Sequence, residues 1–259
     1  MRGYEKTSVF ANCVSRDYAG ELKNRGDVVK VPKIGPVQIK DYTRGGPISY
    51  DAINGTTLDI TIDQEKYWAL KADDVDQMQA APAFLDGATK NAAYALRDTI
   101  DTYTAGILTT GAGTKLYLGT PYNGGDDAIE LFTSLAMKLD ELNVPRLGRF
   151  VVVPPFVVKG IAMTVIDDGT SNETAISEGF ITRISGFDVY MSNNLVTDAD
   201  VTTIVAGVKP AATHIVQIAK TETLRDKDSF SDLVRGMAIY TSAVLMPEGL
   251  ITARVRKPA

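Results

Sequence analysis

One motif in the sequence could carry metal or nucleotide chemistry, the run Gly124-Gly125-Asp126-Asp127. Adjacent carboxylates on a turn between two strands can hold divalent ions against phosphate groups. The residues that follow, up to about Asn143, instead have the periodicity of an amphipathic helix. Asp126 is then expected to cap that helix and Asp127 to lie in its first turn, where a carboxylate complements the helix dipole. The motif therefore predicts a helix N-terminus and not a metal site.

Two further acidic stretches are better explained without catalysis or metal binding. Residues 167–173 are rich in oxygen ligands but lack the alternating spacing of a calcium-binding loop. Asp73, Asp74 and Asp76 could supply a carboxylate pair for acid–base catalysis. Their position ahead of a long predicted helix explains them as charges that complement its N-terminus. We therefore expect a solvated loop at 167–173 and no acid–base pair.

The chain has one histidine, His214, and one cysteine, Cys13. These counts exclude an internal disulfide, a cysteine-based zinc site and most histidine-based metal sites and relays. His214 lies in a strand-like run without a nearby acid or nucleophile, so a packed or surface histidine is expected. Cys13 is expected to behave as a small apolar residue. We expect no catalytic, cofactor-binding or metal-binding residue, and no enzyme activity.

The composition is that of a globular protein with a sizeable core. Of the 259 residues, 44% are hydrophobic and 23% are charged, and the formal net charge is -5 at pH 7. A protein that grips nucleic acid over a broad surface needs a basic face, which this chain could have only locally. No apolar run approaches the roughly 18 residues of a membrane-spanning helix, and no secretory signal is seen. We expect a reducing cytoplasm and no membrane contact.

From Asp27 the sequence alternates with period two, first over residues 28–40 and again over residues 56–70. A turn-rich stretch, residues 43–55, separates the two runs. The pattern predicts one long β-hairpin with arms of about 15 residues, each spanning roughly 50 Å at ~3.3 Å per residue. Because an isolated two-stranded ribbon is marginal in water, we expect a surface outside the ribbon to cover its apolar side.

A long helix is predicted from Ala83 to Leu108, with Pro82 suited to its first turn. Its apolar residues recur at spacings of three and four and form one stripe: Leu85, Ala88, Ala92, Leu96, Ile100 and Tyr103. Its polar residues, among them Arg97, Asp98 and Asp101, are expected mostly to lie elsewhere. At 1.5 Å per residue the helix would be nearly ~40 Å long.

The rest of the chain mixes helices and strands without regular alternation, which favours an α+β fold. A Gly- and Thr-rich loop is expected at 109–125. A second helix is expected from Asp126 to about Asn143, with a stripe of Ile129, Phe132, Leu135, Ala136, Leu139 and Leu142. Further elements are predicted as a strand at 150–153, a helix at 156–165, and strands at 187–191, 201–205, 214–218, 237–245 and 250–256.

Four parts of the chain carry a family resemblance in their order and spacing: Val9–Tyr18 with Gly26–Pro32, Thr61–Ala69 with Asp73–Asp76, Gly186–Asn194, and Val234–Tyr240 with Pro247–Leu250. Together they resemble the major capsid proteins of tailed bacteriophages, whose fold is shared with encapsulin nanocompartments. The first two parts look like the entry to and exit from that family's extended loop. The third resembles a strand of its axial domain, and the last resembles the returning strands of its peripheral domain.

The resemblance implies an α+β capsid-protein fold with four parts. These are an N-terminal arm (residues 1–25), an extended β-hairpin loop (26–72), a peripheral domain with a long spine helix (73–125 and 221–259), and an axial domain (126–220). We expect the loop around Asp41, Tyr42 and Arg44 to contact a neighbouring subunit.

The resemblance also implies a structural subunit that self-assembles as hexamers and pentamers into an icosahedral shell enclosing phage DNA. Its expected location is the virion capsid, after assembly in the bacterial host cytoplasm. Its expected partners are copies of itself, with scaffolding and portal proteins as further partners and packaged DNA by enclosure only. Two alternatives remain open: an encapsulin-like shell protein that holds protein cargo, and an α+β nucleotide-processing enzyme that uses Asp126 and Asp127.

Overall fold

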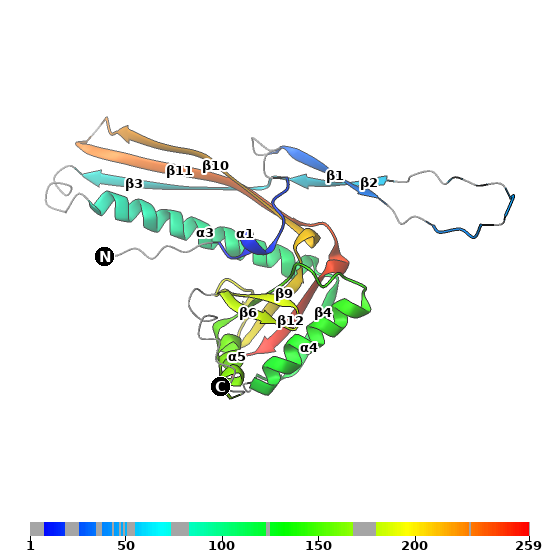
Figure 1. Cartoon of the computed structure of the whole chain (residues 1–259). Coiled ribbons are helices and arrows are strands. Elements are labelled where there is room, and N and C mark those ends of the chain that lie inside the picture. The colour runs from blue at the N-terminus through cyan, green and yellow to red at the C-terminus, as the bar shows by residue number, and fades with distance from the viewer. Residues whose placement is uncertain are drawn as a thin grey trace.

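The protein is known from a computed structural model, which describes residues 8–18, 26–34, 38–42, 44–46, 48, 50, 55–73, 83–122, 125–167, 180–227 and 229–258. Figure 1 shows a long sheet with a helix beneath it, a second sheet below with helices beside it, and a ribbon that projects to one side. The mixture of helices and strands confirms the α+β class.

In chain order the elements are α1 (Phe10–Cys13), β1 (Val28–Ile34), β2 (Gly55–Thr61), β3 (Gln64–Asp73), α3 (Ala83–Gly111), β4 (Thr114–Pro121), α4 (Gly125–Glu141), β5 (Arg149–Val153), α5 (Pro155–Asp167), β6 (Phe180–Ile184), β7 (Phe187–Met191), β8 (Thr197–Asp198), β9 (Val201–Val208), η2 (Lys209–Ala211), β10 (Ala212–Arg225), β11 (Ser231–Val244), η3 (Pro247–Gly249) and β12 (Leu250–Arg256). The expected long helix, the second helix and the five expected C-terminal strands are all confirmed. Two strands are longer than predicted, since β10 ends seven residues later and β11 begins six residues earlier.

The lower sheet is mixed, in the order β4-β12-β9-β5-β7-β6, with β8 paired to β9. All five residues of β5 are buried, as a central strand covered on both faces requires. On one face, Leu131 and Leu135 of α4 pack with Val151, Val153 and the buried part of α5. On the other face, α1 and the last turns of α3 pack against β5, β9 and the start of β12. This second core joins the two halves of the molecule.

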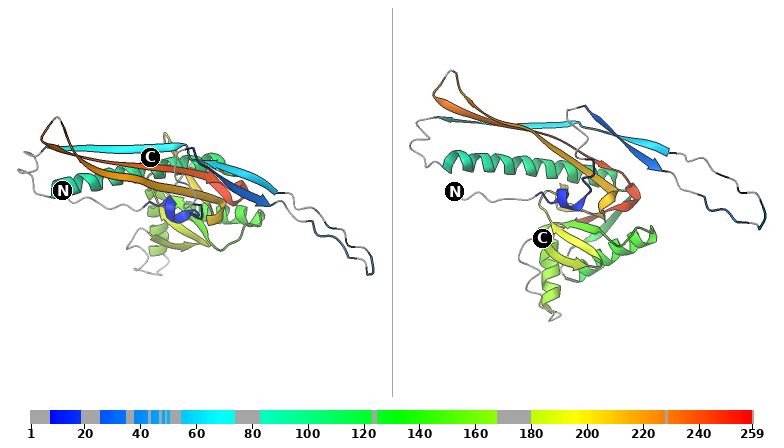
Figure 2. Two further views of the ribbon diagram at one scale, coloured as in Figure 1. Left: turned by 90° about the horizontal axis from the view of Figure 1, so that it is seen from above. Right: turned by 45° about the horizontal axis from the view of Figure 1, so that its top comes forward.

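The upper sheet has three long antiparallel strands in the order β10-β11-β3, and α3 runs along one of its faces (Figures 1 and 2). Across β11 and β3, Gly236 lies opposite Trp68. Ile100 and Leu108 of α3 are buried, and the ring of Tyr103 meets that of Tyr240 edge-on at 5.4 Å. The spine-like helix is therefore held by contacts along its length and not by its own propensity alone.

The projecting ribbon consists of β1 and β2, paired antiparallel from Val28 opposite Thr61 to Ile34 opposite Gly55. It is shorter than the predicted hairpin, because the chain leaves it at Ile62 and Asp63 and β3 then pairs with β11. The apolar side of its base is covered by the same subunit: Val29, Val31, Ile60 and Ile62 pack with Ile215 and Ile239. The expectation that a surface outside the ribbon covers its apolar side is therefore confirmed for the base, and that surface is the upper sheet of the same subunit.

Two other expectations fail for reasons of tertiary pairing. Residues 114–121, expected to be part of a loop, form β4, whose parallel pairing with β12 supplies hydrogen bonds that composition does not reveal. In α4, Ile129 is 50% exposed and Leu142, just beyond the helix, is 43% exposed, although both were expected on its buried stripe. The sheet beneath α4 reaches only the central residues of that stripe.

Gly207 in β9 offers a test of the packing between the lower sheet and η3. A Cβ atom at Gly207 would lie 2.5 Å from the carbonyl oxygen of Gly249, a backbone atom that cannot easily move. We expect Gly207→Ala to lower the free energy of unfolding by about 1–3 kcal/mol. Gly106→Ala is the control, since a Cβ there meets nothing within 4 Å and should add about 0.5–1 kcal/mol. Equal urea-unfolding midpoints for the two variants would contradict the packing described.

Candidate subunit-contact site

The residues first considered for chemistry are not gathered into a catalytic or metal site in the described part of the chain. No group of three or more His, Cys, Asp or Glu residues that could hold a metal is found among the described residues. The helix expected after the Gly-Asp-Asp motif is confirmed as α4. It begins at Gly125, so Asp126 lies inside the helix and is not the N-cap residue that the sequence predicted. The side chain of Asp126 lies outside the described residues, as do Asp74, Asp76 and residues 168–173.

His214 is a buried structural residue, 3% exposed, at the junction of α3 with the upper sheet. Its Nδ1 lies 3.2 Å from Thr104 Oγ1 and 3.0 Å from Ser242 Oγ, and those two hydroxyl oxygens are 2.9 Å apart. Burial, followed by the nearby charge of Arg16, lowers the pKa of His214 to about 4. His214 is therefore neutral at pH 7 and ties one helix to two strands. The expectation of a packed histidine is confirmed.

The N-terminal segment is attached to α3 through a buried carboxylate, Asp101, which is 1% exposed. Ser8 Oγ donates a hydrogen bond to Asp101 Oδ1 at 2.5 Å, and the Val9 amide donates to Asp101 Oδ2 at 3.1 Å. The hydroxyl of Ser8 also accepts the Ala11 amide at 3.2 Å, at the start of α1. Asp101 was expected among the outward-facing polar residues. Its role depends on a segment far away in the sequence.

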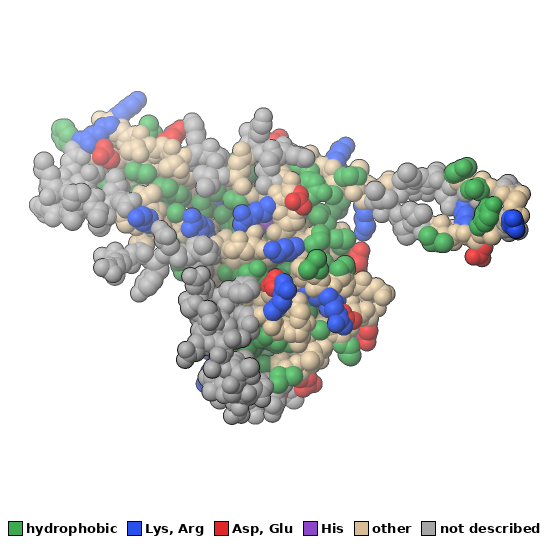
Figure 3. Space-filling view, viewed as in Figure 1, with side chains coloured by type: hydrophobic (Ala, Val, Ile, Leu, Met, Phe, Trp, Pro, Cys, Tyr) green, Lys and Arg blue, Asp and Glu red, His purple; other side chains and the backbone are tan. Residues whose placement is uncertain are grey.

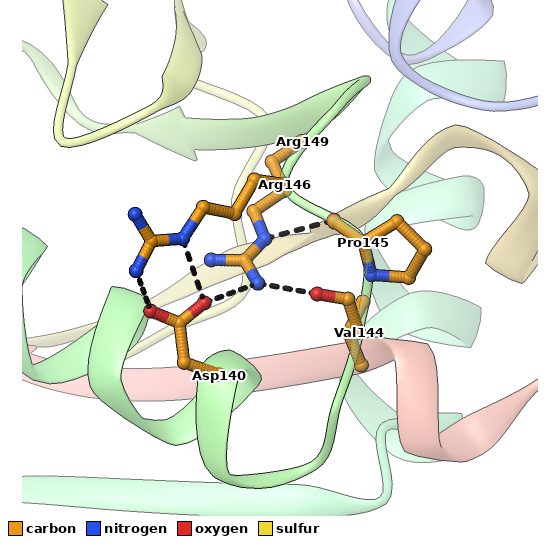
Figure 4. Close-up of polar contacts among 5 residues, drawn as sticks. All are labelled: Asp140, Val144, Pro145, Arg146 and Arg149. Atoms are coloured by element: carbon orange, nitrogen blue, oxygen red, sulfur yellow. Dashed lines mark hydrogen bonds and ion pairs between the residues drawn. The ribbon is translucent and has the colours of Figure 1, made fainter.

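A polar cluster fixes the turn between α4 and β5 (Figure 4). Arg149, 1% exposed, donates to Asp140 Oδ1 at 2.7 Å and to the carbonyl oxygens of Val144 and Pro145. Arg146 donates to Asp140 as well, at 2.6 and 3.2 Å. The hydrogen bonds from Arg146 and then Arg149 hold the pKa of Asp140 below its usual value. Sequence patterns gave no sign of this cluster, because its central residue is an arginine at the first position of an apolar strand.

The base of the ribbon is tied to α3 where β2 passes into β3. Tyr103 Oη donates to the carboxylate of Asp63, at 2.9 Å from Oδ1 and 3.2 Å from Oδ2. Burial, followed by the effect of Asp63, raises the pKa of Tyr103 to about 12. Thr241 Oγ1 of β11 donates to the Thr61 carbonyl oxygen at 3.1 Å. The direction in which the ribbon leaves the body is therefore set by contacts with both α3 and β11.

The residues expected to contact a neighbour, Asp41, Tyr42 and Arg44, lie in the loop between β1 and β2, and all three are exposed. Tyr42 is 72% exposed. Three other large apolar side chains of the loop are also mostly exposed: Ile39 at 96%, Ile48 at 65% and Tyr50 at 89%. Figure 3 shows hydrophobic side chains on the described part of this loop, separated from the body. The loop thus combines aromatic, aliphatic and charged groups in water.

Comparison with known proteins places this geometry in a family. No family model matches the sequence, and no curated protein matches it. A solved structure from Mycobacterium phage Che8 is 33% identical, covers 98% of this chain and 93% of its own, and has a TM-score of 0.78. A capsid structure of the Cyanophage P-SCSP1u is 17% identical, with coverage of 100% and 91% and a TM-score of 0.77.

The chain belongs to the major capsid protein family of tailed bacteriophages. A virus-like particle from Pyrococcus furiosus is also similar, but at 9% identity and a TM-score of 0.59, over 96% of this chain and 92% of its own. A role in a phage capsid is therefore favoured over the encapsulin-like alternative. The role of this capsid protein is structural, and the same holds for the homologues that the comparison finds. No helix in the described part of the capsid protein is long and apolar enough to cross a membrane.

The buried contact of Arg149 can be separated from the exposed contact of Arg146 by parallel substitutions. Arg149→Lys removes the planar donors that reach two carbonyl oxygens and Asp140 at once, and is expected to cost about 2–4 kcal/mol of unfolding free energy. Arg146→Lys, at a side chain that is 79% exposed, should lower the unfolding midpoint much less, because solvent screens an exposed ion pair. Urea titration followed by circular dichroism measures both. Similar losses for the two variants would show that Arg149 does not hold the turn.

Tyr103→Phe tests whether the Tyr103–Asp63 contact sets the direction of the ribbon. The substitution removes one hydroxyl and leaves the ring contact with Tyr240, so the fold should persist with a loss of about 0.5–1.5 kcal/mol. Assembled particles of the variant should have a broader distribution of diameters in electron micrographs than the wild type. Tyr117→Phe, at an exposed position in β4, is the control. A distribution as narrow as in the wild type would show that this hydrogen bond does not control particle geometry.

Proposed function

We propose that this capsid protein assembles as hexamers and pentamers into a closed icosahedral shell that encloses phage DNA. The observation that carries the proposal is the loop between β1 and β2, whose large apolar side chains are exposed far from the body that covers the ribbon's base. Apolar side chains exposed to water favour association with another surface. In a closed ring of identical subunits, each subunit has a neighbouring copy whose surface can cover these side chains. Asp41, Tyr42 and Arg44 are proposed as part of that contact.

The proposed domain organisation follows the two sheets. The peripheral domain consists of α3 with the β10-β11-β3 sheet, and the axial domain consists of the lower sheet with α4 and α5. β12 pairs with both β9 and β4 in the lower sheet, so β4 and β12 are better assigned to the axial domain than to the peripheral one. The ribbon and its loop form the extended part, and residues 8–18 belong to the N-terminal arm.

The same proposal gives the other partners of this capsid protein and its location. The shell assembles in the bacterial host cytoplasm with scaffolding and portal proteins and becomes the virion capsid. DNA is held by enclosure, because a net charge of -5 does not supply a strongly basic wall.

Charge reversal in the loop tests the proposed contact. Arg44→Glu should leave the circular dichroism spectrum and unfolding midpoint unchanged, since Arg44 is exposed. It should reduce the yield of complete particles, measured by sucrose gradient and negative-stain microscopy, by about tenfold or more, the effect of a like-charge contact costing ~1.4 kcal/mol. Lys159→Glu on the exposed face of α5 is the control. Normal particle yield from Arg44→Glu would remove Arg44 from the contact.

A further inference from the structure

A cavity of about 470 Å³ lies between α3 and the upper sheet, within the range of roughly 300–1,000 Å³ typical of sites that bind small molecules. Small residues widen it, since Ala93 and Gly236 both line it. At Gly236 a Cβ atom would lie 2.6 Å from the indole ring of Trp68, so this glycine allows the indole to form part of the wall. The large apolar side chains of the wall come from both elements: Trp68, Leu96, Ile100, Val216 and Met237.

The cavity is elongated along the helix. On α3 its lining residues extend from Thr89 to Ile100, a stretch of about 16 Å at 1.5 Å per residue. Thr104, one turn beyond Ile100, has its hydroxyl 3.2 Å from His214 Nδ1, so Ile100 and His214 lie at the same end of the cavity. The lining residues of β10 extend from His214 to Thr221, which marks the opposite end. This shape suits an extended chain of carbon atoms better than a compact ring system.

The two ends of the cavity differ in charge. At the end near His214, the N-terminal segment contributes Ser8 and Arg16 to the lining. Burial and then the charge of Arg16 lower the pKa of His214, which places the guanidinium close to the imidazole. The opposite end is lined by Thr89 and Thr221, which carry no charge. A ligand that complements the cavity therefore has an anionic group at one end only.

Arg16 is a cation that a ligand can reach. Its Nε donates to the Ala11 carbonyl oxygen at 2.7 Å, which holds the guanidinium at the cavity wall, and its side chain is exposed. Its two terminal nitrogens have no hydrogen-bond partner among the described residues, and no carboxylate is found among the described residues that line the cavity. Arg97 also lines the cavity, but it already interacts within the chain and its charge is not needed here. A carboxylate accepts two parallel hydrogen bonds from a guanidinium, so it is the group that suits Arg16.

We infer that the cavity between α3 and the upper sheet binds a fatty acid, with the carboxylate at Arg16 and the alkyl chain extending between the helix and the sheet towards Trp68 and Thr221. The site lies within one subunit, so the inference does not depend on assembly into a shell. It gives this capsid protein a small-molecule site in addition to its structural role.

Tryptophan fluorescence tests binding directly, because Trp68 is the only tryptophan in the chain and lines the cavity. Dodecanoate added to the full-length protein, below the concentration at which it forms micelles, should shift the emission to shorter wavelength and saturate at one molecule per subunit. From octanoate to dodecanoate the affinity should rise about fourfold for each buried CH₂ group. The gain should end once the chain is longer than the cavity. A shift that does not saturate, or an affinity that rises at the same rate up to octadecanoate, would overturn the inference.

Matched substitutions on α3 test whether the ligand occupies this cavity. Ala93→Phe adds a ring on the cavity side of the helix and should weaken dodecanoate binding at least tenfold, with an unchanged circular dichroism spectrum. Ala95→Phe adds the same ring at an exposed position of the same helix and should leave the affinity unchanged. Should Ala93→Phe fail to fold, Ala93→Leu adds a smaller side chain and should weaken binding in the same direction. Wild-type affinity in a folded Ala93 variant would place the ligand elsewhere and overturn the inference.

The role of Arg16 is tested by comparing decanoate with 1-decanol, which has the same chain and no carboxylate. Arg16→Gln should weaken decanoate binding about tenfold, the effect of losing a charge-assisted hydrogen bond. Binding of 1-decanol should not change. Equal losses for both ligands, or no loss for decanoate, would overturn the assignment of the carboxylate to Arg16. Particle formation is measured separately, so a failure of fatty-acid binding leaves the shell proposal intact, and a failure of assembly leaves this site intact.

Discussion

The ribbon of β1 and β2 has two apolar regions, and the body of the subunit covers only the one nearest to it. At the base, Val29, Val31, Ile60 and Ile62 are sealed against Ile215 and Ile239 of the upper sheet. Beyond the base, the ribbon extends past the sheet, and the large side chains of its loop remain in water. Burial of apolar surface yields roughly 25 cal/mol per Å², so the base stabilises the subunit and the loop favours association. One extended element therefore links the fold of the monomer to the formation of a shell.

That linkage requires the ribbon to leave the body in a defined direction. The direction is set by polar contacts at its base, where Asp63 accepts from Tyr103 and Thr61 accepts from Thr241. Hydrogen bonds have stricter geometry than apolar packing, so they fix an angle that packing alone would leave loose. Hydrogen bonds fix how other elements meet as well. Asp101 binds the N-terminal segment to α3, and His214 of β10 binds α3 and β11.

Arg149 shows what such a contact requires. An isolated buried charge is strongly unfavourable, and it is tolerated only when it is paired and fully hydrogen-bonded. Here Asp140 supplies the opposite charge, and the carbonyl oxygens of Val144 and Pro145 accept two further hydrogen bonds. These contacts hold the turn between α4 and β5, the central strand of the lower sheet. Rigid subunits suit a shell, because small angular errors in each copy would accumulate around a closed surface.

Much of the secondary structure could be predicted from local pattern. The long helix from Ala83 and the buried strand at 150–153 follow from periodicity and apolar runs, and β7 and β12 occur within their predicted bounds. The family could be recognised because several segments, each of which resembles it only weakly, occur together in the family's order and spacing. The single histidine and the single cysteine could also be read directly, and these counts exclude a cysteine-based zinc site and most histidine-based metal sites.

Tertiary structure decided which elements pair and which polar residues are buried. Nothing in residues 114–121 marks them as an edge strand, because the partner that completes their hydrogen bonds lies more than a hundred residues later. The same is true of β3, which alternates like the ribbon but pairs with β11, and of Asp101, whose neighbours on α3 give no hint of Ser8. Periodicity indicates which side of one element is buried, but not which other element covers that side. Which side chains from two elements come together depends on how those elements pack, as for Trp68 of β3 and Arg97 of α3, which line the same cavity.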